Sequence, residues 1–166
     1  MILASYCKLG LRCTYKCGTN EHLPDSEFLK KNFLAGKVIP VCPEVFGALT
    51  TPRDPSEISG GNGTDVVNGR ARVLSSKGID VTENFMKGAL MALDIAQKWD
   101  VKGALLTECS PSCGVNFVYD GTFTKTKIKG PGVLGALLLK SFGPDFILAS
   151  DIQSEEELKN IFGHIL

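Results

Sequence analysis

The chain has 166 residues, in which 18 lysines and arginines balance 18 aspartates and glutamates. A chain of this length can bury a core without disulfides or metal, so stability does not explain its six cysteines. Because the net charge is zero, there is no global positive field for nucleic acid or an anionic membrane, and we expect neither as a partner.

The N-terminal segment, residues 1–10, contains an apolar stretch that is too short to span a membrane, and no basic leader precedes it. We therefore expect a cytoplasmic protein. Because the cytosol keeps thiols reduced, the cysteines are expected to be free thiols, metal ligands or catalytic groups rather than disulfides.

Four short apolar runs are predicted to be strands of one parallel sheet. They have the length and nearly continuous hydrophobicity of strands buried on both faces. The runs are residues 2–6, 38–41, 104–106 and 146–149. The chain shows no repeat, low-complexity tract or linker. We therefore expect residues 1–166 to form a single Rossmann-like α/β domain, with a mainly parallel sheet flanked by helices and with β-hairpin excursions.

Helical segments are expected near the last two strands. Residues 80–99 carry an apolar face at helical spacing, and Asp80 and Glu83 are expected to form a capping box at its start. A second helix is expected at residues 133–141. The terminal segment begins at the predicted cap Ser154, with Glu157 at the reciprocal position.

Two hairpins are expected outside the sheet. Asn68-Gly69 lies between extended-looking segments and is a strong signal for a two-residue hairpin turn. Residues 116–128 place Asp120-Gly121 between two β-rich arms, which predicts a second ribbon.

Cysteines follow three of the predicted strands. Cys7 follows the first strand, Cys42 the second, and Cys109 and Cys113 the third. Because the carboxyl ends of parallel strands meet at one edge of a sheet, where such folds bind ligands, we expect these thiols to lie together. Two further thiols lie in the loop after the first strand and are close enough to belong to the same site: Cys13 and Cys17.

The thiols also have simpler interpretations. A single cysteine is often only a small buried hydrophobe. A structural zinc site would show C-x2-C pairs, which this chain lacks, and His22 and His164 supply no ligand pair. A redox pair of Cys109 and Cys113 lacks C-x-x-C spacing. An all-thiolate site favours an iron–sulfur centre, and three converging thiolates with an open fourth position would form a catalytic cluster.

Four segments occur in the order of one known family. They are ILASYCKLGLRCTY, VIPVCPEVFGALTTPR, GGNGTDVVNGRARV, and ECSPSCG followed by YDGTF. Through them the chain resembles the 2-thiouracil desulfidase-like proteins, long classed as a domain of unknown function, from residue 2 to about residue 139. The resemblance implies a Rossmann-like domain with a [4Fe-4S] cluster held by three cysteines, which leaves one iron free for the substrate sulfur.

Carried over by motif, the implied ligands are Cys7, Cys42 and Cys113, with Cys13 as a further candidate. The chain departs from the family pattern at Cys17, where an Asp-Gly pair normally follows the tyrosine. It departs again at Cys109, a position that is usually basic or polar.

The implied activity is the non-redox, hydrolytic removal of sulfur from a thiolated pyrimidine base or nucleoside, which yields the oxo form and sulfide. The attacking water needs a base, and Glu44 is the candidate. The alternative role of Glu44 is structural, as a carboxylate in the first turn of a helix, where the helix dipole favours negative charge. Ser110 and Ser112 would bind the ring edge or orient water, or else cap a turn.

Two residues are candidates for substrate binding. Arg53 stands in a loop stiffened by prolines, and its alternative role is a salt bridge with Asp54 or Glu57. Tyr119 could stack on a pyrimidine, and its alternative role is packing within the ribbon.

Two other functions compete with desulfuration. Residues 130–135 match G-x-G-x-x-G and Asp151 lies near the position of a ribose-binding acid, which would indicate a dinucleotide-binding oxidoreductase. The preceding KTKIK, however, is not the buried strand that this motif requires. The other alternative is a thiol-rich metal-binding or redox-sensing module.

Overall fold

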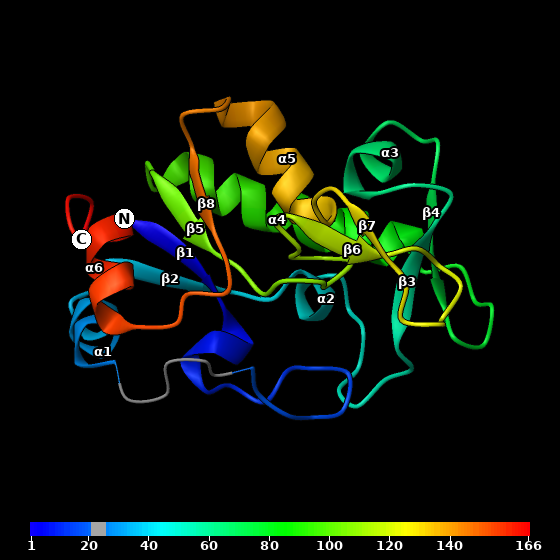
Figure 1. Cartoon of the computed structure of the whole chain (residues 1–166), viewed down its shortest axis with the longest axis horizontal. Helices are drawn as coiled ribbons and strands as arrows, with labels where there is room; N and C mark the ends of the chain where they lie inside the picture. The colour runs from blue at the N-terminus through cyan, green and yellow to red at the C-terminus, as the bar shows by residue number, and fades with distance from the viewer. Residues whose placement is uncertain (21–25) are drawn as a thin grey trace.

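The computed structural model describes residues 1–20 and 26–166, so that His22 lies outside the described residues. At the centre is a four-stranded sheet in the order β2-β1-β5-β8 (Figure 1), in which every pairing is parallel. Its strands are β1 (Ile2–Ser5), β2 (Val38–Val41), β5 (Gly103–Leu105) and β8 (Ile147–Ala149). These bounds match the four apolar runs to within one residue, which confirms the predicted parallel sheet.

Helices cover both faces of this sheet because side chains alternate along each strand. On β1, Ile2 packs with side chains of two helices and Leu3 packs with side chains of two others. The helices on the Ile2 side are α1 (Glu27–Leu34) and α6 (Glu155–Phe162). Those on the Leu3 side are α4 (Thr82–Lys98) and α5 (Val133–Phe142). The α/β class with flanking helices is therefore confirmed.

The fold also contains three short helical segments: the 3-10 helix η1 (Tyr6–Leu9) after β1, α2 (Pro43–Phe46) after β2, and α3 (Gly63–Val67). Helices α2 and α4 approach each other backbone to backbone. A Cβ added at Gly88 of α4 would overlap the carbonyl oxygen of Pro43, so only glycine permits this packing. Asn84 of α4 donates a hydrogen bond to the Gly47 carbonyl oxygen at 2.8 Å. This contact fixes α2 directly after β2.

Two antiparallel ribbons lie beside the central sheet and gather on one side of it in Figure 1. One joins β3 (Ser56–Ser59) to β4 (Arg72–Ser75), and the other joins β6 (Phe117–Tyr119) to β7 (Lys127–Lys129). The second is the ribbon predicted around Asp120-Gly121. No helix of the described residues is long and apolar enough to cross a membrane.

The predicted hairpin at Asn68-Gly69 is wrong. Asn68 caps the end of α3, and Gly69 has the positive φ of 72° that often follows a helix. Strand β4 pairs instead with β3, which precedes α3. The Asn-Gly pair is equally suited to a helix end and to a hairpin turn, because both require a positive φ.

The predicted caps are partly correct. Helix α4 begins at Thr82, and the Asp80 carboxylate accepts from the Thr82 N–H at 2.9 Å, so Asp80 forms no capping box with Glu83. At α6, Ser154 accepts from the Glu157 N–H as predicted. The Glu157 carboxylate, however, accepts from the N–H one residue earlier than a capping box would require.

Candidate functional site

A cavity of about 570 Å³ opens at the carboxyl edge of the central sheet. Its walls are formed by the segments that follow β1, β2 and β5, together with residues of β3 and of the β6–β7 ribbon. Cys17, which the sequence placed near this site, does not line the cavity, but all residues given a ligand, catalytic or substrate-binding role do: Cys7, Cys13, Cys42, Cys113, Glu44, Ser110, Ser112, Arg53 and Tyr119. The convergence of strand ends therefore brings residues that are far apart in the sequence into one site.

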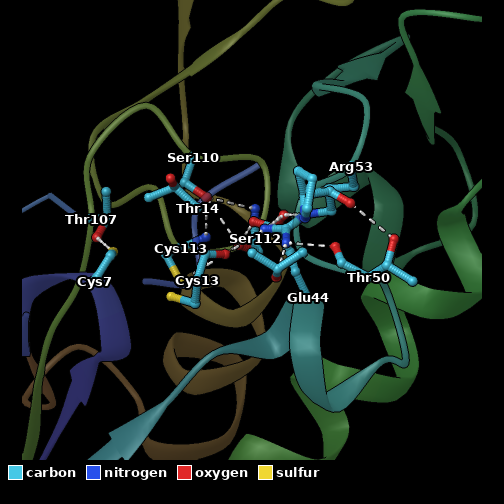
Figure 2. Close-up of polar contacts among 12 residues, drawn as sticks. Cys7, Cys13, Thr14, Glu44, Thr50, Arg53, Thr107, Ser110, Ser112 and Cys113 are labelled. Atoms are coloured by element: carbon cyan, nitrogen blue, oxygen red, sulfur yellow. Dashed lines mark hydrogen bonds and ion pairs between the residues drawn. The ribbon is translucent and has the colours of Figure 1, made fainter. Parts of the chain in front are cut away.

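Four buried thiols line the inner part of the cavity. Cys7, Cys13 and Cys42 form a cluster of their own, and Cys113 is buried in the adjoining main core. The Cys13 thiol lies within hydrogen-bonding reach of both Cys7 and Cys42. Figure 2 shows Cys7, Cys13 and Cys113 on one side of the site, with Glu44 and Arg53 on the other.

The protonation states of these thiols depend on one another. The hydrogen bond from Cys13 lowers the pKa of Cys7, and the Thr107 hydroxyl, 3.0 Å from the Cys7 sulfur, acts in the same direction. Cys13 also lowers the pKa of Cys42. The pKa of Cys13 is raised in turn, because its proton is shared with two sulfurs. Burial raises the pKa of Cys113 to about 12.

The thiols fit a metal group bound by sulfur. Thiolates are soft ligands that select zinc, copper(I) or iron–sulfur centres, and a bound metal deprotonates them. Among the described residues, no group of three or more His, Cys, Asp or Glu side chains is placed to hold a single metal ion. A cluster tolerates wider spacing than one ion does, because each thiolate binds a different iron. The Ser5 hydroxyl is also buried in this wall beside Cys113, with no other hydrogen-bond partner in the described chain.

A chain of polar contacts runs along the opposite wall (Figure 2). The Arg53 side chain forms an ion pair with Glu44, and its Nε donates to Glu44 Oε2 at 2.6 Å. Ser112 Oγ donates to Glu44 Oε1 at 2.9 Å and lies 2.9 Å from Ser110 Oγ. One carboxylate oxygen is therefore held by a guanidinium and the other by a hydroxyl that lines the cavity.

Arg53 is fully engaged by the protein. Beyond Glu44, its guanidinium donates to the carbonyl oxygens of Thr50 and Cys13 and to the Thr51 hydroxyl. Together with the ion pair to Glu44, these contacts engage all three nitrogens of the guanidinium. The side chain is only 8% exposed. The alternative of a salt bridge with Asp54 or Glu57 is wrong, and the geometry favours a positioning role over contact with substrate.

The glycine-rich segment 130–135 has a packing role. At the start of α5, the N–H groups of Val133 and Leu134 donate to the carbonyl oxygens of Pro111 and Ser112, each at 2.9 Å. These N–H groups would otherwise face a pyrophosphate in a dinucleotide site. The preceding strand β7 also belongs to an antiparallel ribbon rather than to the central sheet. The dinucleotide-binding alternative is therefore contradicted.

Among the cavity-wall residues that sequence reasoning missed, two make contacts that bear on the site, Thr107 and Glu57. Thr107 lies two residues after the end of β5, and the rule that placed cysteines at strand ends could have found it. Glu57 of β3 is 9% exposed and accepts hydrogen bonds from the backbone N–H groups of Gly121 and Phe123, at 3.1 and 2.9 Å. This contact holds the β6–β7 loop beside the cavity. No sequence motif surrounds Glu57 that would have indicated its place in the cavity wall.

Cys17 and Cys109, the two cysteines at which the chain departs from the family pattern, differ in position. Cys109 lines the cavity and has a positive φ of 58°. Cys17 is exposed and is not among the lining residues.

Comparisons with known proteins identify the family to which the chain is related. The model of a family described as 2-thiouracil desulfurase matches residues 2–149. The chain is 43% identical over 161 residues to the uncharacterized protein YbbK of Bacillus subtilis (strain 168), covering 97% of this chain and 99% of YbbK. It is also similar to the solved structure of the [4Fe-4S]-dependent thiouracil desulfidase TudS. That match has a TM-score of 0.80 and 30% sequence identity, and covers 99% of this chain and 96% of that one.

Proposed function

The chain belongs to the 2-thiouracil desulfurase family, and from this premise we propose that it replaces the sulfur of a thiolated pyrimidine with oxygen and releases sulfide. The observation that carries the proposal is the convergence of four buried thiols and the Glu44–Ser112 pair on one cavity. The volume of about 570 Å³ is typical of small-molecule sites, which suits a base or nucleoside as substrate.

We propose a [4Fe-4S] cluster as the cofactor, held by Cys7, Cys42 and Cys113. The similarity to TudS, which is [4Fe-4S]-dependent, and the all-sulfur donor set support this choice. The Cys13 thiol lies within hydrogen-bonding reach of Cys7 and Cys42, so Cys13 is the further candidate for a cluster ligand. When bound, such a cluster supplies an open iron site that can accept the substrate sulfur as a Lewis acid.

The protein side chains would manage the protons of the hydrolysis. A water that attacks the thiocarbonyl carbon must lose protons, and the departing sulfur must gain them, so that water and thiocarbonyl become carbonyl and hydrogen sulfide. Ser112 and Glu44 both line the cavity, and Ser112 Oγ donates to Glu44 Oε1, so a proton can pass from the cavity to Glu44 through the Ser112 hydroxyl. Ser110 orients the Ser112 hydroxyl, and Arg53 holds the carboxylate in place.

The substrate ring would lie toward the outer wall of the cavity. Tyr119 lines that wall at the end of β6 and offers an aromatic face on which a pyrimidine can stack. Because the guanidinium of Arg53 is occupied, we assign recognition of the ring to the outer wall and not to Arg53.

Anaerobic reconstitution tests the proposal. The protein should turn brown, bind about four irons and four sulfides per chain, and release sulfide from 2-thiouracil with formation of uracil. Serine substitutions at Cys7, Cys42 or Cys113 should each abolish cluster binding, whereas Cys17→Ser serves as the matched control and should retain the cluster. A colourless, zinc-binding protein would refute the cofactor. A brown protein that releases no sulfide would instead favour a redox-sensing module.

A further inference from the structure

The outer face of α4 exposes apolar side chains. Leu90 and Met91 are 48% and 44% exposed, whereas Phe85 and Ala89 on the inner face of the same helix are fully buried. The exposed face forms an open groove lined by seven side chains of this helix. Their spacing of three and four residues places them on one side of the helix. They are Glu83, Met86, Lys87, Leu90, Met91, Asp94 and Ile95.

This face is complementary to itself when it is read in the reverse direction. If a second α4 runs antiparallel to the first, with Leu90 opposite Met91, every apolar residue meets an apolar residue and every charge meets the opposite charge. The pairs, from the centre outward, are Leu90 with Met91, Lys87 with Asp94, Met86 with Ile95, and Glu83 with Lys98. Parallel, in-register pairing would instead place Lys87 against Lys87 and Asp94 against Asp94.

We propose that the outer face of α4 is a homodimer interface, in which the α4 helices of two copies pack antiparallel about a two-fold axis. In such an interface each pair occurs twice, because residue i of one copy contacts residue j of the other and the reverse. The apolar centre would supply the affinity, and the flanking charges would set the register.

The charges on this face are available to a second copy. Within the part of the chain that the structure describes, Lys87 has no carboxylate partner and Glu83 has no cationic partner. Asp94 is paired with Lys98 one turn later at 2.7 Å, but both side chains are more than half exposed. Asp94 can therefore form an ion pair with Lys87 of a second copy without first breaking a buried ion pair.

The interface would leave the cavity open. No residue of α4 lines the cavity, and the inner face of α4 packs against α2 and α5. Dimerisation is thus independent of the proposed desulfuration, and variants of this face should change assembly without changing the chemistry.

Sedimentation velocity with the purified full chain tests the dimer. The wild-type protein should sediment as a dimer whose population rises with concentration. The variant Lys87→Glu should raise the dimer dissociation constant by about tenfold or more, because two attractive contacts become two repulsive ones. Lys31→Glu, the same charge reversal on exposed α1, is the control and should leave the dimer unchanged. A wild-type protein that stays monomeric at all concentrations would overturn the proposal.

Charge exchange tests the register. Lys87→Glu and Asp94→Lys should each be monomeric alone, and an equimolar mixture should form a heterodimer, because each lysine then faces a carboxylate of the other chain. The double variant Lys87→Glu/Asp94→Lys should recover the homodimer. Circular dichroism should show that all variants are folded, since both positions are exposed. A mixture that stays monomeric, or a dimer that survives both single reversals, would refute the antiparallel pairing.

Discussion

Ser112 Oγ donates a hydrogen bond to Glu44 Oε1 at 2.9 Å, although the two residues are 68 positions apart in the chain. Glu44 lies in the first turn of α2, after β2, and Ser112 lies in the loop after β5. Both flank a proposed cluster ligand, since Cys42 precedes Glu44 by two residues and Cys113 follows Ser112 directly. The proton-handling pair is therefore positioned by the same backbone segments that position the thiols.

Removing the Ser112 hydroxyl should separate chemistry from cofactor binding. We expect Ser112→Ala to lower the rate of sulfide release by about 10² to 10⁴-fold, the range typical of a lost proton-transfer group. The variant should still bind iron, because no sulfur ligand is changed. Iron content and sulfide release from 2-thiouracil, measured on one preparation, check this. Wild-type turnover in Ser112→Ala would remove Ser112 from the proton path.

Loss of Arg53 should destabilise the fold as well as the site. Arg53→Met leaves the Glu44 carboxylate without its buried partner, and breaking such a pair typically costs about 3–5 kcal/mol in the free energy of unfolding. Arg53→Lys retains the charge but not the five-donor geometry, so its effect should be intermediate. Urea unfolding measures the loss. A dominant effect on KM, with kcat unchanged, would indicate that Arg53 contacts the substrate after all.

The sequence was sufficient to place the thiols. Short, continuous apolar runs are characteristic of buried parallel strands, and the carboxyl ends of such strands lie along one edge of the sheet. The sequence alone therefore places Cys7, Cys42 and Cys113 at that edge. The position of Cys13 in the loop after the first strand placed it near them, and the family resemblance added the polar residues of the opposite wall.

Contacts that depend on loop conformation could not be predicted. Arg53 has two acidic residues nearby in the sequence, Asp54 and Glu57, yet it pairs with Glu44, because the loop turns its side chain toward α2. Glu57 is instead held by backbone N–H groups of a distant ribbon. Asn68-Gly69 shows the same limit, since its preference for positive φ does not reveal whether a helix or a strand precedes it.

Glu57 should control the mobility of the β6–β7 loop. Glu57→Ala removes the acceptor for the Gly121 and Phe123 N–H groups, so these amides should exchange with solvent faster. Because Tyr119 adjoins this loop, KM should rise more than kcat falls. Hydrogen exchange read by mass spectrometry, together with steady-state kinetics, checks both effects. Glu57→Gln keeps an acceptor oxygen and should lie between Ala and wild type, and equal exchange in all three proteins would contradict the anchoring role.

The close approach of α2 and α4 predicts a strong effect of one methyl group. Gly88→Ala would place a Cβ against the Pro43 carbonyl oxygen, which is backbone and cannot move without shifting α2. Overpacking of this kind costs about 1–3 kcal/mol. We expect a lower melting temperature and a reduced iron content, because Cys42 and Glu44 adjoin Pro43. Gln97→Ala, at an exposed position of the same helix outside the proposed dimer face, is the control. A Gly88→Ala protein with wild-type stability would mean that the helices do not pack this closely.

Thr107 should tune the proposed cluster without holding it. Its hydroxyl lies 3.0 Å from the Cys7 sulfur, and hydrogen bonds to cluster sulfurs are among the factors that set a cluster's reduction potential. Thr107→Val keeps the shape of the side chain but removes the hydroxyl, so the sulfur should carry more negative charge and the potential should fall. Thr107→Ser retains the hydroxyl and should stay near the wild-type value. Potentiometric titration followed by electron paramagnetic resonance measures all three proteins. An equal shift in both variants would assign the effect to packing, because only the valine removes the hydrogen bond.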